Sequence, residues 1–178
     1  SRAALTPEMK LTVKAVKKAV RFLKKQNAKK INGYYYGIVH PDCSYDLTED
    51  ARWIDAVKYK NPERIYNGEI GEIEGARFVE TTEAKIWAKA GAAKSTSDTT
   101  KIDVYGTLIF GANAYATTKI EGGGLKTIIK QLGSAGTGDP LDQRATVGWK
   151  ALKVTEILTE AYMIRIETAS TFSDGEAN

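Results

Sequence analysis

The sequence is poor in the residues from which reactive sites are usually built. It holds one cysteine, Cys43, and one histidine, His40. A single thiol excludes an internal disulfide and is typical of a reducing compartment. The same scarcity argues against a zinc site, because such sites draw on several Cys and His ligands. We therefore expect neither a metal nor a cofactor.

Long apolar runs are also missing. No stretch of about eighteen apolar residues occurs, so the sequence predicts no transmembrane helix and no membrane partner. The N-terminus lacks the basic-then-apolar pattern of a signal peptide. Hydrophobic residues make up 42% and charged residues 27% of the 178 positions, which is ordinary for a globular chain. The net charge of +4 is too small to identify a nucleic-acid-binding protein by itself.

Two stretches resemble catalytic or phosphate-binding motifs. His40 and Cys43 are three residues apart near a predicted helix start, where a Cys–His nucleophile with a lowered thiol pKa is conceivable. The alternative, which we favour, is that His40 ends a strand and Cys43 is a small buried apolar residue. The glycine-rich residues 133–138 lack the Gly-Lys-Ser/Thr ending of a phosphate loop. We expect no enzyme and no small-molecule substrate.

Charged residues gather in two places. An acidic cluster, which we interpret as surface charge on short helices, consists of Asp42, Asp46, Glu49, Asp50 and Asp55. Four cations recur at spacings that align them on one face of a helix predicted over Thr12–Asn27, namely Lys14, Lys18, Arg21 and Lys25. Three roles are open for this cation face: a solvated surface, a contact with other subunits, or a contact with nucleic-acid phosphates. No aromatic side chains alternate with the cations to stack on bases.

The remaining pattern is that of an α+β chain with a mixed sheet flanked by helices. Further helices are predicted over Asp42–Leu47 and Asp50–Val57, with Tyr45, Trp53, Ile54 and Val57 facing inward. Strands are predicted over Tyr34–Val39, Ile70–Thr81 with a turn at Glu74-Gly75, Val104–Phe110 and Leu125–Leu132. The small and polar residues Ala88–Thr100 predict a mobile loop. Period-two runs in Ala145–Leu152 and Tyr162–Glu167 predict an antiparallel pair.

Four stretches, in this order, resemble the major capsid protein of tailed bacteriophages in its N-four-type branch. They are Tyr35–Asp46, Asn67–Thr81, Val104–Gly111 and Asp139–Lys150, and the resemblance runs from about Leu11 to Ala169. That branch is related to the Hong Kong 97 phage capsid fold. The resemblance implies an axial (A) domain in residues 1–138 and the returning strands of a peripheral (P) domain with a C-terminal tail in residues 139–178.

The resemblance also implies a function. It suggests the C-terminal half of a coat protein of a phage or prophage, which self-assembles into hexamers and pentamers of an icosahedral shell around the DNA genome. The expected partners are copies of the chain, with packaged DNA nearby. The expected location is the virion capsid, and the bacterial host cytoplasm during assembly. A basic nucleic-acid-binding domain is the alternative.

The resemblance assigns two local roles. Ala88–Thr100 corresponds to the A-domain tip near the five- and six-fold axes. The loop near three-fold contacts corresponds to Asp139, Asp142, Gln143 and Arg144. Some relatives crosslink their subunits through Lys–Asn isopeptide bonds. The positions to compare here are Gln143 and Lys150, and we do not expect crosslinking, because the lysine-donating loop of the family has no counterpart in these 178 residues.

Overall fold

The computed structural model describes residues 1–60, 70–95, 97–119, 121, 123–134 and 136–172. The chain divides into two compact units. The first, called the sheet unit, comprises residues 1–114 and 159–178. The second, called the ribbon unit, comprises Tyr115–Leu158. The prediction that an A domain ends at residue 138 and P-domain strands follow remains a prediction.

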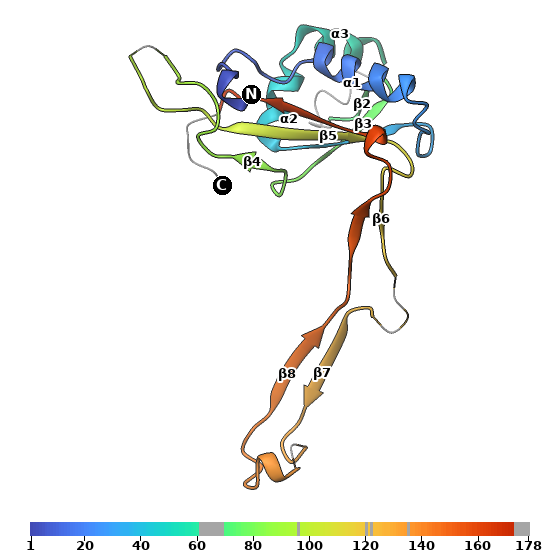
Figure 1. Cartoon of the computed structure of the whole chain (residues 1–178), viewed down its shortest axis with the longest axis vertical. Coiled ribbons are helices and arrows are strands. Elements are labelled where there is room, and N and C mark those ends of the chain that lie inside the picture. Colours follow the sequence, from blue (N-terminus) through green and yellow to red (C-terminus); the bar gives the residue numbers. More distant parts are fainter. Residues whose placement is uncertain (61–69, 96, 120, 122, 135, 173–178) are drawn as a thin grey trace. The chain divides into compact units, whose positions relative to one another are not determined.

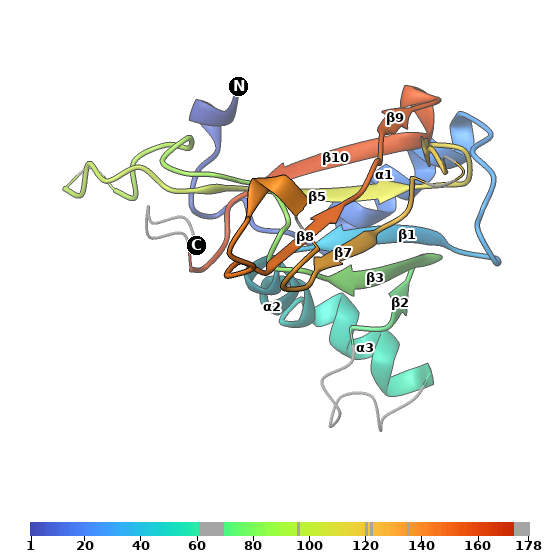
Figure 2. The same ribbon diagram turned by 90° about the horizontal axis from the view of Figure 1, so that it is seen from below.

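The sheet unit is built on a mixed six-stranded sheet. Its strands follow the order β10-β5-β1-β3-β2, and β4 pairs with β5 (Figure 2). Their bounds are β1 Tyr35–Val39, β2 Glu72–Ile73, β3 Ala76–Glu80, β4 Ile86–Trp87, β5 Val104–Phe110 and β10 Met163–Thr168. Among the strands that the structure describes in this sheet, β1 and β3 pair in parallel and the other pairs are antiparallel. Six of the seven residues of β5 are buried, which confirms the predicted central strand.

Helix α1 (Val13–Lys25) covers part of this sheet (Figure 1). The Thr12 side chain accepts a hydrogen bond from the Ala15 N–H at 3.3 Å and so caps the helix start, as predicted. The buried side of α1 is formed by Val13, Val16, Ala19, Val20 and Leu23, and it packs mainly on β10 and β5. Burial of this stripe holds the helix on the sheet, because apolar side chains leave water there.

Two shorter helices follow β1. They are α2 (Pro41–Thr48), with Pro41 at its first position, and α3 (Ala51–Lys60). Trp53 is buried as predicted, but Tyr45 is 49% exposed, so its predicted inward orientation is wrong. Tyr45 lies on the outer side of α2 and contacts the ring of Phe172 at 5.2 Å between centroids. The side chain of Val57 lies outside the described residues.

Glycines allow two tight features of the sheet. In the β2–β3 hairpin, Glu74 and Gly75 have φ of 53° and 83°, which is the turn that the sequence predicts. Within β1, a Cβ on Gly37 would lie 2.6 Å from ring carbons of Phe78 on the adjacent strand. The Phe78 ring therefore occupies the space that any other residue at position 37 would need.

The ribbon unit consists of two antiparallel strand pairs. Strand β6 (Tyr115–Thr117) pairs with β9 (Thr155–Ile157), and β7 (Lys126–Lys130) pairs with β8 (Thr146–Lys150). The short helix η2 (Gly136–Gly138) lies in the β7–β8 connection (Figure 1). All residues of these four strands are exposed. The predicted strand over Leu125–Leu132 is confirmed.

The predicted pairing of the two C-terminal runs is wrong. Strand β8 pairs with β7, whereas β10 pairs with β5 in the sheet unit. Period-two alternation identifies a strand and its two faces, but the choice of partner depends on contacts distant in sequence. Two further short helices lie in the described part of the sheet unit, η1 (Arg2–Ala4) and η3 (Glu160–Tyr162).

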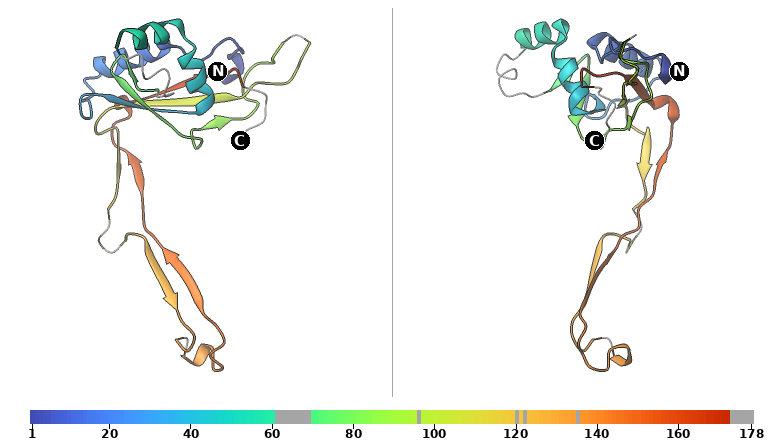
Figure 3. Two further views of the ribbon diagram at one scale, coloured as in Figure 1. Left: turned by 180° about the vertical axis from the view of Figure 1, so that it is seen from behind. Right: turned by 90° about the vertical axis from the view of Figure 1, so that its left-hand side faces the viewer.

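The long segment before β5 has little regular structure, as expected from its composition. Among its described residues, Ala93 forms an isolated antiparallel bridge with Lys101. The Gly91 N–H donates to the Ile102 carbonyl at 2.9 Å, and Ala92 donates to Leu5 at 2.9 Å. These bonds hold the base of a loop that extends away from the sheet (Figure 3).

Candidate interaction surfaces

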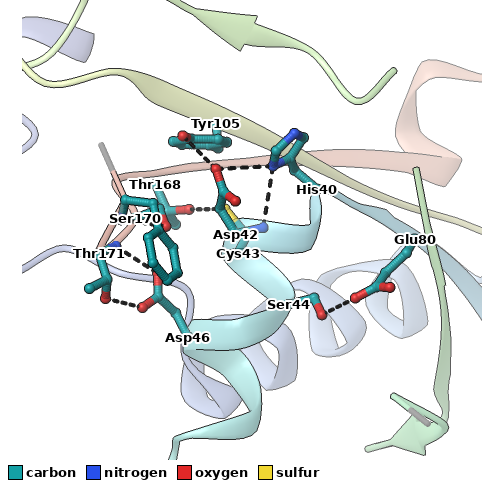
Figure 4. A network of polar contacts seen from close by, with 11 residues as sticks. His40, Asp42, Cys43, Ser44, Asp46, Glu80, Tyr105, Thr168, Ser170 and Thr171 are labelled. Atoms are coloured by element: carbon teal, nitrogen blue, oxygen red, sulfur yellow. Dashed lines mark hydrogen bonds and ion pairs between the residues drawn. The ribbon is translucent and has the colours of Figure 1, made fainter. Parts of the chain in front are cut away.

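His40 and Cys43, which we considered as a base and a nucleophile and did not favour in those roles, are buried at the start of α2 (Figure 4). His40 Nδ1 accepts a hydrogen bond from the Asp42 N–H at 3.3 Å and caps the helix. Cys43 Sγ lies 3.8 Å from Thr168 Oγ1, and both side chains are buried. His40 thus faces a backbone amide, and Cys43 faces a hydroxyl. Cys43 thus links α2 to the end of β10, whereas His40 caps α2 and lies beside the Tyr105 ring of β5.

Burial also determines the protonation of the thiol. It raises the pKa of Cys43 to about 12, and the nearby carboxylates of Asp46 and Asp42 contribute in the same direction. The hydrogen bond between Cys43 and Thr168 opposes this rise in pKa without cancelling it. The hypothesis of a thiol with a lowered pKa at a helix start is therefore wrong, and the interpretation of Cys43 as a small buried residue is confirmed.

Two carboxylates of the predicted acidic cluster serve the interior rather than the surface. Asp46 is buried; it accepts the Thr171 N–H at 3.0 Å and the Thr171 hydroxyl. Asp42 accepts the Tyr105 hydroxyl at 2.8 Å. Burial raises the pKa of Tyr105, and the hydrogen bond to Asp42 makes a smaller contribution in the same direction. The interpretation of these two acids as surface charge is wrong, because the residues after β10 fold back onto Asp46 and the Tyr105 side chain of β5 reaches Asp42.

The Asp50 carboxylate links the starts of helices α1 and α3. It accepts the Val13 N–H of α1 at 2.9 Å and the Arg52 N–H of α3 at 3.0 Å. The Ser44 hydroxyl donates in the same region to Glu80 of β3. The two bonds to Asp50 satisfy backbone amides at helix starts, which otherwise remain without intrahelical partners. Nothing in this network is arranged as a nucleophile, a base and an oxyanion-binding group.

The predicted cation face is on the outside of α1. Lys14, Lys18, Arg21 and Lys25 are all exposed there. The helix carries six cations and no acidic residue. One of the six, Lys17, pairs with Glu74 at 3.2 Å. The structure thus places the four predicted side chains on one accessible surface, and their role remains a prediction.

An apolar groove runs beside that surface, between α1 and the edge strand β10. Its volume is about 810 Å³. Its apolar lining comes from Ala15, Ala19 and Phe22 of α1 and from Ala161, Met163, Ile164 and Ile166. Lys18, Glu160, Arg165 and Glu167 stand around it. Sequence reasoning missed this groove, although the small residues Ala15 and Ala19, four positions apart on one helix face, leave the room for it.

A charged cluster holds the N-terminal segment on β10. Arg2 donates two hydrogen bonds of 2.9 Å to Glu167, and Arg165 donates a third. These contacts lower the pKa of Glu167, and the hydrogen bonds from Arg2 make the largest contribution. The guanidinium carbons of Arg2 and Arg165 lie 4.0 and 5.2 Å from the Trp87 ring centroid. The indole therefore lies within cation–π distance of two guanidinium groups.

The predicted three-fold loop is found in the connection between β7 and β8. Asp139 is buried and accepts the Arg144 N–H at 2.6 Å through its carboxylate. Its carbonyl accepts the Asp142 N–H at 3.0 Å. Gln143 is exposed. The structure brings the four residues into one turn in which Asp139 is structural, and a contact role for the others remains a prediction.

The ribbon unit exposes an unusual amount of apolar side chain. Among its described residues, those that are at least half exposed are Leu125, Ile129, Leu132, Leu141, Val147, Trp149, Leu152, Val154, Ile157 and Leu158. Trp149 and Val147 are each 76% exposed. A two-stranded hairpin is marginally stable alone, and large exposed apolar patches mark interaction sites. The ribbon unit is therefore a candidate interaction surface, in addition to the α1–β10 groove.

Two other kinds of site are absent from the described residues, a membrane-spanning helix and a metal-binding group. No helix there combines the length and the apolarity that a membrane crossing needs. In the same part of the chain, no group of three or more His, Cys, Asp or Glu side chains is arranged to hold a metal ion.

Comparison of the structure with solved structures gives a consistent result. The chain is similar to a subunit of the capsid of Ralstonia phage GP4, with a TM-score of 0.67 and 15% identity over 100% of this chain and 52% of that chain. It is similar to the capsid of cyanophage Pam1 with a TM-score of 0.69 and 11% identity, over 97% and 50%. It is also similar to the capsid of Helicobacter pylori bacteriophage KHP30 with a TM-score of 0.64 and 11% identity, over 95% and 62%.

These likenesses establish the fold, which is the predicted α+β capsid type. The chain spans about half the length of the capsid chains that it matches. No curated protein matches it. The family described as phage capsid protein, however, matches residues 2–132, which is well over half of the sequence. The resemblance drawn from the four ordered stretches is thereby confirmed, and the chain belongs to the phage capsid protein family.

Proposed function

We propose that this chain is a structural subunit of the icosahedral capsid of a phage or prophage. The observation that carries the proposal is the family match over residues 2–132 on a fold shared with three phage capsids. Copies of the chain would assemble into hexamers and pentamers through heterologous contacts that close rings. The DNA genome would lie inside the shell. Membership of this family favours a structural, non-enzymatic role.

The two candidate surfaces support assembly physically. The exposed apolar side chains of the ribbon unit need protein to cover them, and the α1–β10 groove offers a second apolar site with charges around it. We assign the cation face of Lys14, Lys18, Arg21 and Lys25 to subunit contacts. The turn with Asp139, Asp142, Gln143 and Arg144 is assigned to contacts near three-fold axes.

The proposal includes domain assignments and a location. Residues 1–138 would form the A domain and residues 139–178 the P-domain strands and tail. The subunit would reside in the virion capsid after assembly in the bacterial host cytoplasm. Its partners would be copies of itself and the packaged DNA.

Electron microscopy of the full-length protein, expressed with its neighbouring phage genes, tests the proposal. We expect closed shells, or rings of five and six subunits. Trp149→Ser should abolish them if the apolar side of β8 is covered in the shell, whereas Glu156→Gln, at an exposed position of β9 in the same unit, should have less effect. Particles of neither kind in any condition would contradict the proposed function.

The alternative is a basic nucleic-acid-binding domain, which the six cations of α1 favour. Phosphate contacts by that helix should give DNA binding that weakens steeply with added salt. If soluble monomers bound DNA tightly through α1 and never assembled, this alternative would replace the capsid proposal.

A further inference from the structure

The two faces of the β7–β8 hairpin differ in chemistry. Directly opposed residues of an antiparallel pair share a face, and successive residues along each strand alternate. By the observed register, the apolar face is formed by Thr127, Ile129, Val147 and Trp149. The opposite face, called the lysine face, is formed by Lys126, Ile128, Lys130, Thr146, Gly148 and Lys150. The hairpin is therefore amphipathic, with three cations on one side.

The lysine face concentrates positive charge without compensation from its own strands. Lys126 is directly opposite Lys150. Opposed side chains begin with Cβ atoms only about 5 Å apart, where like charges destabilise the pair. The segments KTIIK and TVGWK contain no acidic residue. An anion placed between Lys126 and Lys150 would relieve this repulsion.

The shape of the face suits an extended polyanion. Every residue of both strands is exposed, and no atom lies within 4 Å of the Cβ position of Gly148. Lys130 is four residues from Lys126, which corresponds to about 13 Å along a strand. A single carboxylate cannot reach both ends of this row, whereas a chain of phosphates can. Only Ile128, at 36% exposure, adds a large apolar side chain.

We propose that the lysine face of the β7–β8 hairpin binds the phosphate backbone of DNA while its apolar face packs against protein. The inference rests on the proposed function, because a capsid interior supplies DNA as the polyanion. An acidic protein is the less suitable partner, since the centre of a protein interface is usually apolar and aromatic. The apolar residues of this hairpin lie on the other face. Phosphate contacts require only cations and carry no sequence preference.

Binding of a mixed-sequence 20-base-pair duplex to the 178-residue chain, followed by fluorescence anisotropy across 50–200 mM salt, tests the proposal. The test variant combines Lys126→Gln, Lys130→Gln and Lys150→Gln. Loss of three phosphate contacts should reduce the slope of log K against log salt by about 2.7 and weaken binding at 50 mM salt on the order of a hundredfold. A variant with arginine at the same positions keeps the charges and should keep the slope.

The matched control combines Lys14→Gln, Lys18→Gln and Arg21→Gln on α1, which removes the same charge from the sheet unit. It should change the slope by less than about 1. Thermal melting of each variant verifies that these exposed substitutions leave the fold intact. An unchanged slope in the hairpin variant, or an equal loss in the α1 variant, would overturn the proposal. So would polyglutamate that binds as tightly as DNA with the same lysine dependence, because it would indicate an acidic protein partner.

Failure of this inference is distinguishable from failure of the proposed function. If the triple glutamine variant formed shells that package DNA normally, the proposed capsid function would stand. The lysine face would then be rejected as the DNA contact. Wild-type protein that binds DNA through the hairpin but never forms shells would reject the capsid assignment instead.

Discussion

The strands of the sheet unit and those of the ribbon unit differ in how far their side chains are buried. In the sheet unit, β5 is almost entirely buried between neighbouring strands and α1. In the ribbon unit, all residues of β6, β7, β8 and β9 are exposed. The first unit thus has an apolar core of its own, whereas none of the residues described in the second unit belongs to a buried apolar cluster. A fold that stabilises itself is joined in sequence to an exposed apolar surface, which we propose is covered by other protein.

Core truncation should reveal this difference most strongly. Leu23→Ala removes a fully buried side chain of α1 and should lower the free energy of unfolding by about 2–5 kcal/mol. Ile129→Ala removes a side chain that is 64% exposed and should change it by less than about 0.5 kcal/mol. Denaturant melts of the 178-residue chain provide the measurement. Equal costs for the two changes would show that the hairpin has a core of its own.

A pair of glycine substitutions sharpens the comparison. Gly37→Ala places a Cβ 2.6 Å from Phe78 and should destabilise the protein by about 1–3 kcal/mol. Gly148→Ala meets nothing within 4 Å and should be neutral or stabilising by up to about 1 kcal/mol. Both melting midpoints can be followed by circular dichroism. Rescue of Gly37→Ala by Phe78→Leu would verify that the ring is the obstacle, and a harmless Gly37→Ala would refute it.

The buried carboxylate at α2 should matter more than an exposed one in the ribbon unit. Asp46→Ala leaves the Thr171 amide and hydroxyl without their acceptor and should cost about 1–3 kcal/mol. Asp142→Ala, at an exposed position, is the control, although its φ of 52° adds a small strain of its own. Hydrogen exchange at the Thr171 amide should accelerate only in the first variant. Unchanged protection there would show that the C-terminal segment is held in another way.

The smallest expected effect is a pH dependence from the cluster around Glu167. Arg2 lowers the pKa of this carboxyl below its usual value of 4.5 in the folded state. Its contribution to stability is therefore present above pH 4.5 and is lost as the pH falls through the lower, folded-state pKa. The pair is partly solvated, so the contribution should be about 0.5 kcal/mol.

Glu167→Gln should remove that part of the acid sensitivity, as seen in melts between pH 3 and pH 6. Glu156→Gln in the exposed strand β9 serves as the control and should leave the pH profile unchanged. If the two variants had the same profile as wild type, the Arg2–Glu167 contact would contribute nothing to stability.

Local elements of this protein follow from short-range chemistry that the sequence displays. The α1 stripe, the Thr12 cap, Pro41 at a helix start and the Glu74-Gly75 turn depend on residues within a few positions of one another, so they were predicted with nearly correct bounds. The four ordered stretches also predicted the family. With one cysteine and one histidine, the sequence also argued against a Cys–His catalytic site and a zinc site.

Tertiary structure alone decided which segments meet. Alternation in residues 145–152 and 162–167 identified two strands, but only the three-dimensional pairing assigned one to β7 and the other to β5. The burial of Asp46, the α1–β10 groove and the separation of apolar and lysine faces on the hairpin likewise depend on long-range register. The physical reason is that a side-chain pattern specifies two faces of an element, whereas the surface that covers each face is selected by contacts between distant parts of the chain.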